Sequence, residues 1–401
     1  MQTITRSAST ASLAAAGLAL IATTYGLARF AYGLFTPAFR AAFDLDGATV
    51  GLIAAGSYAA YCLGVVAATI ITPRRGPRIV AVAAGILATT GIAVIGSAQD
   101  PLALAVGVVV GGASTGVASP ALADAVTLRA APARRDRLQA IINAGTGLGV
   151  MVSGPVALFL LDEWRVAWAL FALLAAGATA AAAVAVPRGR ADVDRRITPA
   201  RVSWRRWGEL AAAAFLLGAG SGAVWTFGQD VLGEAVGRGP ATVAWIVLGA
   251  CGLLGAASGD LVLRIGVAGA WRILVAAMAA STAAVAVSPL APPLALVAAG
   301  VFGASYIALT GVLLVAGTRT APGDAARGVG IAFLALAIGQ ALATPIWGLL
   351  GDATELSTSL LWAAGFTAGG LIIGPPASPP AEAAEPQPGA GRNPADVRAG
   401  A

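Results

Sequence analysis

One arginine inside an apolar stretch is the clearest candidate for chemistry in this sequence. Arg29 lies 17 positions into the apolar stretch 12–36, which is about 25 Å along a helix axis. Tyr25 precedes it by four residues and Tyr32 follows it by three, so a helix would place all three side chains on one face. A guanidinium in hydrocarbon is costly and usually faces a cavity or a partner. Arg29 therefore either contributes to solute binding or gating, or else snorkels outward or bonds to backbone carbonyls of a neighbouring helix.

Other polar and aromatic side chains also lie inside apolar stretches. Trp225 follows the glycine-rich segment 218–222, which would permit a kink or local unwinding of a helix, although close packing explains it equally well. Asn143 and Gln340 could reach a cavity or could tie helices together with hydrogen bonds. All five tyrosines fall within apolar stretches, including Tyr58 and Tyr61. Each could equally pack in the core with one satisfied hydroxyl.

The carboxylates lie near the ends of the apolar stretches, and none falls at mid-stretch. Asp124, Asp230 and Asp260 are the three closest to the interior. Proton coupling usually requires a carboxylate that can titrate within the membrane. Two alternatives follow: Asp124 or Asp230 couples protons from a gate, or the protein moves its solute without protons.

Enzyme chemistry and metal binding find little support in the residue types. The chain has no His, and its two cysteines, Cys62 and Cys251, both lie inside apolar stretches. These features indicate no metal site, no cofactor and no set of acid, base and nucleophile. The arginines form no continuous basic face, so the sequence pI of about 10.1 does not indicate a nucleic-acid partner.

The composition is that of a membrane protein. Of the 401 residues, 58% are hydrophobic and only 11% are charged, and the mean hydropathy is +0.82. A helix needs roughly 20 apolar residues to span the bilayer. Stretches of that kind fall near 12–36, 48–71, 78–97, 102–126, 138–161, 165–186, 209–233, 241–263, 269–289, 291–316, 326–349 and 356–374.

Arginine is distributed unevenly between the two sets of connecting segments. One set, together with both tails, holds 21 of the 25 arginines, whereas the other holds Arg40, Arg165 and Arg238. The positive-inside rule therefore places both termini and the central loop 187–208 in the cytoplasm, with the protein in the inner membrane. Residues 375–401 contain seven prolines and are predicted to form a disordered tail.

The chain repeats itself at an offset of 190 residues. Five boundary or kink residues recur without a gap, and the pairs are Arg74 with Arg264, Gly76 with Gly266, Arg137 with Arg327, Pro155 with Pro345 and Asp162 with Asp352. This predicts an all-α membrane protein of twelve helices in two parallel six-helix repeats, with the solute site between them. The expected parts are an N-terminus 1–11, a first bundle 12–186, the central loop, a second bundle 209–374 and the tail.

Several motifs resemble those of the major facilitator superfamily. In that family the loop after helix 2 reads Gly-x-x-x-Asp-Arg-x-Gly-Arg; here Arg74 and Gly76 match the first copy, and Arg264 and Gly266 match the second. Both copies lack the acidic residue, which weakens the expectation of the family's ion-pair latch. Gly154 and Pro155 resemble the helix 5 element of antiporter branches, and residues 25–33 resemble helix 1 of the YbfB/YjiJ-type bacterial branch.

The resemblance implies which helices line a central cavity. In the superfamily these are helices 1, 4, 7 and 10, so Tyr25, Tyr306 and Thr310 become candidates for solute binding. The same resemblance makes Arg74, Gly76, Arg264, Gly266, Gly154, Pro155 and Pro345 candidates for gating. It implies a secondary transporter, acting as a monomer, that moves a small solute by alternating access between its two halves.

The unpaired Arg29 favours an anionic or polar solute, because the solute itself could supply the missing countercharge. An alternative is proton-coupled efflux of a hydrophobic or cationic compound, suggested by the Gly-Pro element of helix 5. The absence of a helix 4 arginine and of a buried carboxylate counts against efflux. A membrane enzyme or a non-transporting sensor is a further alternative, disfavoured because no catalytic set and no output domain is present.

Overall fold

The computed structural model describes residues 2–189, 204–320 and 325–376, and within these ranges the regular structure is helical throughout. The predicted tail beyond residue 376 and most of the central loop lie outside the described residues. The first half consists of α1 (Gln2–Ile21), η1 (Ala22–Phe30), α2 (Ala31–Phe43), α3 (Gly47–Arg75), α4 (Pro77–Ser97), α5 (Pro101–Arg129), α6 (Pro132–Asn143), α7 (Gly145–Leu160) and α8 (Trp164–Ala185). The second half consists of α9 (Trp204–Val236), α10 (Arg238–Gly252), η2 (Leu253–Ala257), α11 (Ser258–Ala286), α12 (Leu294–Thr320), α13 (Ala325–Ala353) and α14 (Leu356–Gly369).

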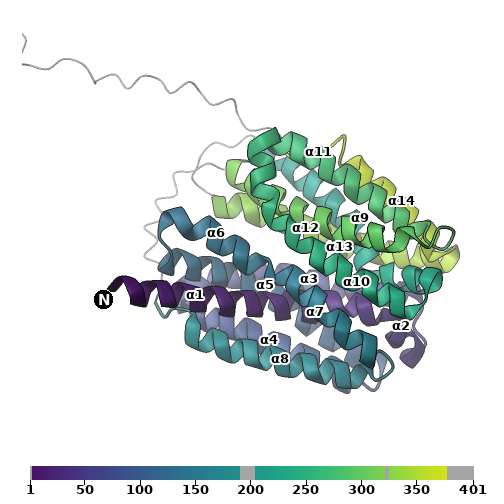
Figure 1. The fold of residues 1–401 in the computed structure, drawn as a ribbon, viewed down its shortest axis with the longest axis horizontal. Coiled ribbons are helices and arrows are strands. Elements are labelled where there is room, and N and C mark those ends of the chain that lie inside the picture. Colours follow the sequence, from purple (N-terminus) through teal and green to yellow (C-terminus); the bar gives the residue numbers. More distant parts are fainter. Residues whose placement is uncertain (1, 190–203, 321–324, 377–401) are drawn as a thin grey trace, which may run out of the picture.

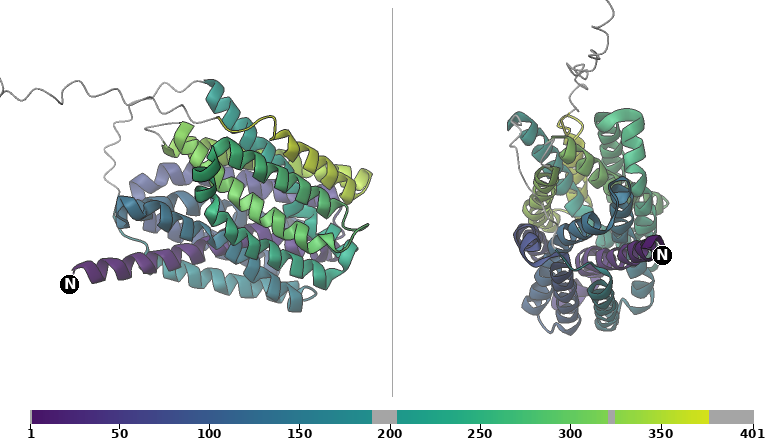
Figure 2. Two further views of the ribbon diagram at one scale, coloured as in Figure 1. Left: turned by 45° about the horizontal axis from the view of Figure 1, so that its top comes forward. Right: turned by 90° about the vertical axis from the view of Figure 1, so that its left-hand side faces the viewer.

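The helices form two groups that run side by side along one long axis. Figure 1 shows α1 to α8 on one side of the molecule and α9 to α14 on the other, and Figure 2 shows the same division from two further directions. The predicted all-α class and the two-part architecture are thereby confirmed. Short connections between antiparallel neighbours explain why consecutive helices pack within one half.

Ten helical stretches of the described residues are long and apolar enough to cross a membrane. One of them, Arg238–Ala286, has 49 residues, about twice what a bilayer requires. It breaks at Gly266, so it contains two of the predicted spans. The last helix, α14, has 14 residues and is shorter than a usual span. Counted in this way, the described helices are compatible with the predicted twelve.

The repeat is visible in backbone conformation. Gly76, between α3 and α4, has φ 82° and ψ 156°, and Gly266, 190 residues later, has φ 74° and ψ 169°. This region of backbone space is essentially restricted to glycine. Pro155 and Pro345 likewise lie inside corresponding helices, α7 and α13. The two halves therefore use the same residue type to make the same sharp turn.

We expect alanine at either of these glycines to destabilise the protein, but unequally. Gly266→Ala adds only backbone strain, about 1–3 kcal/mol, since nothing lies within 4 Å of the new Cβ. Gly76→Ala adds the same strain and also places its Cβ 2.6 Å from the Gly189 carbonyl oxygen. The thermal midpoint of the purified variants measures the difference. Equal midpoints would contradict this reading of the two turns.

Contacts between the halves gather at one end of the bundle, which we call the closed end. Asp352 at the end of α13 accepts hydrogen bonds from the backbone N–H groups of Gly47 (2.8 Å) and Ala48 (2.7 Å) at the start of α3. Asp162 lies 3.0 Å from Arg238 at the start of α10. Because each of these partners is displaced by 190 residues, the two contacts are equivalent by the repeat. The opposite end, where α3, α5 and α12 terminate in arginine-containing turns, is the arginine-rich end.

Helices α2 and α9 meet at the axis that relates the halves. The Thr36 hydroxyl donates to the backbone carbonyl of Thr226 (3.2 Å), its own repeat equivalent, and a residue that touches its equivalent must lie at the symmetry axis. Gly33 allows this approach, because an added Cβ would overlap the Trp225 carbonyl oxygen. The candidate site lies directly beside this crossing.

Candidate functional site

The first transmembrane helix is locally widened where it carries Arg29. Residues Ala22–Phe30 form a π-helix, and the Ala31 N–H bonds to the Gly26 carbonyl five residues back. Gly26 also lies directly against the backbone of Gly149 in α7, where no side chain would fit. Wide turns of this kind are rare and frequently occur at functional sites. The π-helix ends at the residue that follows Arg29.

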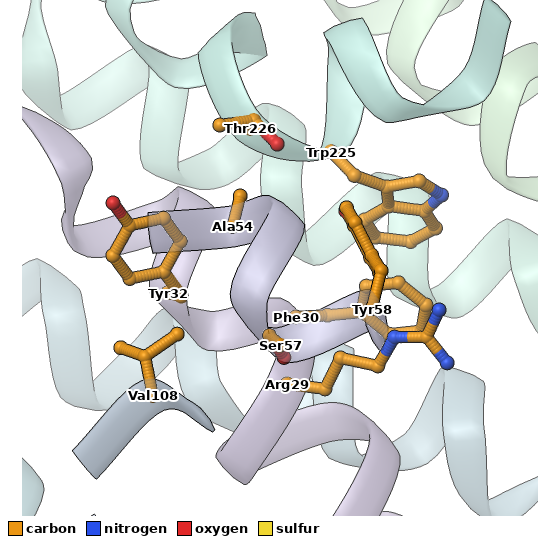
Figure 3. A pocket seen from close by; sticks show the side chains of 9 residues that line it. All are labelled: Arg29, Phe30, Tyr32, Ala54, Ser57, Tyr58, Val108, Trp225 and Thr226. Carbon is orange, nitrogen blue, oxygen red and sulfur yellow. The ribbon is translucent and has the colours of Figure 1, made fainter. Parts of the chain in front are cut away.

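Arg29 is buried at the interface of the two halves. Its side chain is 7% exposed, and its Nη2 donates a 2.6 Å hydrogen bond to Oε1 of Gln340 in α13. The guanidinium carbon lies 4.6 Å from the ring centroid of Tyr61 and 4.9 Å from that of Tyr58, both in α3. Figure 3 shows the guanidinium beside the rings of Phe30, Tyr58 and Trp225. Phe30 lies at 5.2 Å and Tyr25 at 5.9 Å.

The charge of Arg29 is only partly compensated. Among the described residues, no carboxylate lies within ion-pair distance of it, and its Nε is buried without a hydrogen-bond partner. A desolvated cation–π contact contributes about 2 kcal/mol, whereas burying an ion costs several kcal/mol. A bound anion would supply the missing countercharge. The arrangement is therefore suited to binding a negatively charged group.

Gln340 extends this cluster into the second half. Its side chain is fully buried, and its Nε2 lies 3.4 Å from the Ser221 hydroxyl in α9 and 3.5 Å from the Tyr306 hydroxyl in α12. Arg29 comes from the first half, whereas Gln340, Ser221 and Tyr306 come from three helices of the second. A ligand bound to Arg29 would therefore sense the relative position of the two halves.

An aromatic cluster separates Arg29 from the closed end. Trp225 stacks on Phe30 with ring centroids 4.0 Å apart and meets Tyr306, Phe302 and Trp245 edge to face. Trp245 also donates from Nε1 to the Ser153 hydroxyl (3.0 Å), which joins α10 to α7. These rings close the site on the side of the Thr36 contact.

The structure brings together five of the predicted binding candidates: Arg29, Tyr25, Tyr306, Trp225 and Gln340. The expectation that Tyr32 shares the face of Arg29 is wrong. The Tyr32 hydroxyl donates to the Val50 carbonyl (3.1 Å), and Figure 3 shows its ring pointing away from the guanidinium. The wider turns of the π-helix change the angular spacing of side chains, so the three-residue step no longer returns to the same face.

The remaining two binding candidates bond within their own helices. The Thr310 hydroxyl donates to the Ile307 carbonyl (2.7 Å). Asn143 ends α6 and accepts from the Gln139 side chain (3.1 Å). Both are partly exposed, and neither bonds to Arg29 or Gln340.

Sequence reasoning does not assign Tyr58 and Tyr61 to this site, although they lie closest to the guanidinium of all the rings. The available signal is their three-residue spacing on helix 2, which places two aromatic faces on one side of a helix. Ser221 stands out in the sequence only as part of a glycine-rich segment. Its partner Gln340 is 119 residues away, and sequence spacing cannot reveal such a contact.

The gating candidates divide between the two ends. At the closed end, Asp230 in α9 lies 3.8 Å from Arg40, and Gly154 beside Pro155 packs against Ile246 of α10. Pro345 packs in the same way near Gly51 of α3. Each of these contacts joins the two halves.

Toward the arginine-rich end, Asp260 and Arg264 are exposed near the Gly266 turn, and Asp124 lies in the last turns of α5. Arg74 bonds to the Ile70 carbonyl of its own helix (3.2 Å). The following motif residue, Arg78, donates to the carbonyls of Val186 (2.6 Å) and Val184 (3.0 Å) at the end of α8. This copy of the motif thus fastens helices of one half.

Comparison with known protein families gives a match to the Major Facilitator Superfamily over residues 18–344. Comparison with curated proteins gives no match. Among solved structures, a point mutant of the nucleoside transporter NupG has a TM-score of 0.73 at 14% identity, covering 90% of this chain and 98% of its own.

Two other solved structures are similar over comparable lengths. A bacterial homologue of the human lysosomal transporter Spinster, in an inward-facing and occupied conformation, has a TM-score of 0.70 at 15% identity, covering 92% of this chain and 96% of its own. A POT family transporter in complex with a thioalcohol-conjugated peptide has a TM-score of 0.69 at 13% identity, covering 90% and 95%. At these identities the likeness concerns the fold.

Proposed function

Since the chain belongs to the major facilitator superfamily, a family of secondary transporters, we propose that it moves a small anionic solute that binds to Arg29. The observation that carries this proposal is the burial of Arg29 without a carboxylate partner among the described residues. Its branch within the superfamily stays a prediction.

The solute's anionic group would occupy the unbonded edge of the guanidinium. Nε has no partner there, and a carboxylate or phosphate oxygen could accept from it in a charge-assisted hydrogen bond. The Tyr306 hydroxyl and the amide of Gln340 are positioned to bond to other polar atoms of the solute. Tyr25 bonds to Ser119 of α5 (2.8 Å), which holds its ring near Arg29.

Alternating access follows from where the halves touch. The contacts of Asp352 and Asp162 hold the closed end together. The arginine-rich end would face the cytoplasm by the positive-inside rule, so this conformation would open inward. Transport would require the closed-end contacts to break while the arginine-rich ends approach each other, with Arg29 and Gln340 near the pivot.

The efflux alternative is less well supported by this site. A fixed positive charge at the centre would repel a cationic compound, and its partial compensation favours an anion instead. Proton coupling through Asp230 or Asp124 remains compatible with an anionic solute. The deciding experiment is uptake of candidate anions into reconstituted vesicles, with and without an imposed pH gradient. Movement of cationic compounds alone would contradict the proposal.

We expect both termini to face the cytoplasm of a cell that carries the protein in its inner membrane, because 21 of the 25 arginines lie on that side. An alkaline phosphatase fused after residue 374 should be inactive, whereas green fluorescent protein at the same position should fluoresce. An alkaline phosphatase fused between α2 and α3, at residue 45, serves as the matched positive control. Phosphatase activity at residue 374 would overturn this orientation.

A further inference from the structure

A second cavity lies at the closed end, apart from the Arg29 site. It has a volume of about 260 Å³ and is bounded by α2, α9 and α10; Figure 1 shows α2 and α10 at the same end of the bundle. Leu34, Pro37 and Leu161 of the first half form an apolar wall. The opposite wall belongs to the second half and is polar. A ligand here would contact both halves at once.

Asp230 is the central group of the polar wall. Its side chain is 9% exposed, and its Oδ1 lies 3.8 Å from Nη1 of Arg40, which is too long for a hydrogen bond. Its Oδ2 is buried and has no hydrogen-bond partner. A buried carboxylate oxygen without a partner is costly. A positively charged ligand in the cavity would remove this deficit.

The other polar groups of this wall also present oxygen atoms. Glu234 follows Asp230 by one helical turn and stands at the exposed mouth. The Gln229 amide nitrogen donates to the Ala241 carbonyl (3.2 Å), which leaves its oxygen to accept. The Thr242 hydroxyl donates to the Arg238 carbonyl (2.9 Å), and its oxygen can also accept. Carboxylate, amide and hydroxyl oxygens are ligands for hard cations and for ammonium groups.

The local charge sets the valence of the ligand. Asp162, Asp230 and Glu234 carry three negative charges, against the two positive charges of Arg40 and Arg238. One positive charge restores neutrality. We propose that this cavity binds a monovalent cation, either an alkali ion or the ammonium group of a small primary amine. Because its walls come from both halves, the bound cation stabilises the conformation in which this end is closed.

The test is a thermal-midpoint titration of the purified full-length protein with sodium chloride or methylammonium chloride. Tetraethylammonium chloride keeps the total chloride concentration constant, since its ethyl groups hold its charge away from oxygen ligands. A saturable rise of the midpoint is expected. Sodium alone would identify an alkali-ion site, methylammonium alone an amine site, and a response to both supports the shared chemistry.

Two variants and one control locate the effect. Asp230→Asn should remove the response, and Glu234→Gln should raise the half-saturating concentration about tenfold. Glu209→Gln removes an acid from the same helix near its other end and should leave the titration unchanged. Should Asp230→Asn fail to fold, Glu234→Gln decides. The proposal is overturned if the native protein shows no difference between salts, or if Glu234→Gln titrates like the native protein.

Discussion

Replacing Arg29 with glutamine is expected to abolish transport of the solute while raising the thermal stability of the solute-free protein. Losing a charge-assisted contact should weaken binding by about 1.5–3 kcal/mol, or roughly 10- to 150-fold. Removing a buried charge whose Nε has no partner should stabilise the fold by on the order of 1–2 kcal/mol. Gains of this kind occur where a site keeps an unfavourable group for function.

The opposite sign of the two effects separates a binding arginine from a structural one. An arginine that only held helices together would destabilise the protein when it is replaced. Arg29→Lys keeps the charge but loses the planar fork, so it should restore binding only in part. Gln340→Leu provides a matched control, because it removes the partner of Arg29 and leaves the charge. Normal transport by Arg29→Gln, or a lowered melting temperature, would refute the assignment.

Replacing Gly33 with valine is expected to open the closed end. The new side chain would overlap the Trp225 carbonyl oxygen, where α2 crosses α9. Overpacking of this kind costs about 1–3 kcal/mol, enough to shift a two-state equilibrium by roughly 5- to 150-fold. Transport should fall in the same measure, because one of the two alternating states becomes rare.

The opening can be measured as a distance between spin labels. Asp162→Cys and Arg238→Cys supply exposed positions on the two halves, in a background carrying Cys62→Ser and Cys251→Ser. The native Gly33 background should give a short distance, and Gly33→Val a longer one. Gly177→Ala is the matched control, because nothing lies within 4 Å of the added Cβ. An unchanged distance distribution in Gly33→Val would show that this crossing does not hold the end closed.

Much of the architecture could be predicted because its causes are local. Apolar length gives the spans, and the 190-residue offset gives the repeat, which Gly76 and Gly266 confirm in nearly the same backbone conformation. The burial of Arg29 was also predictable, because a charge so deep in an apolar stretch has few alternatives.

The composition of the site was only partly predictable, for two physical reasons. Periodicity arguments assume an ideal α-helix, and the π-helix Ala22–Phe30 turns Tyr32 away from Arg29. The partners of Arg29 also come from distant helices: Gln340 is 311 residues away. In the same way, Asp162 and Asp352 were evident as repeat equivalents, but the contacts they make across the halves depend on tertiary packing.

The central claim, that Arg29 binds the anionic group of the solute, is tested most directly by a thermal-shift comparison of acids with their neutral amides. Each small carboxylic acid is paired with its amide, and both are titrated into the native protein and into Arg29→Gln. The prediction is that at least one acid stabilises the native protein, that its amide does not, and that Arg29→Gln responds to neither. Stabilisation by amides or amines alone, or by an acid that acts equally on Arg29→Gln, would contradict it.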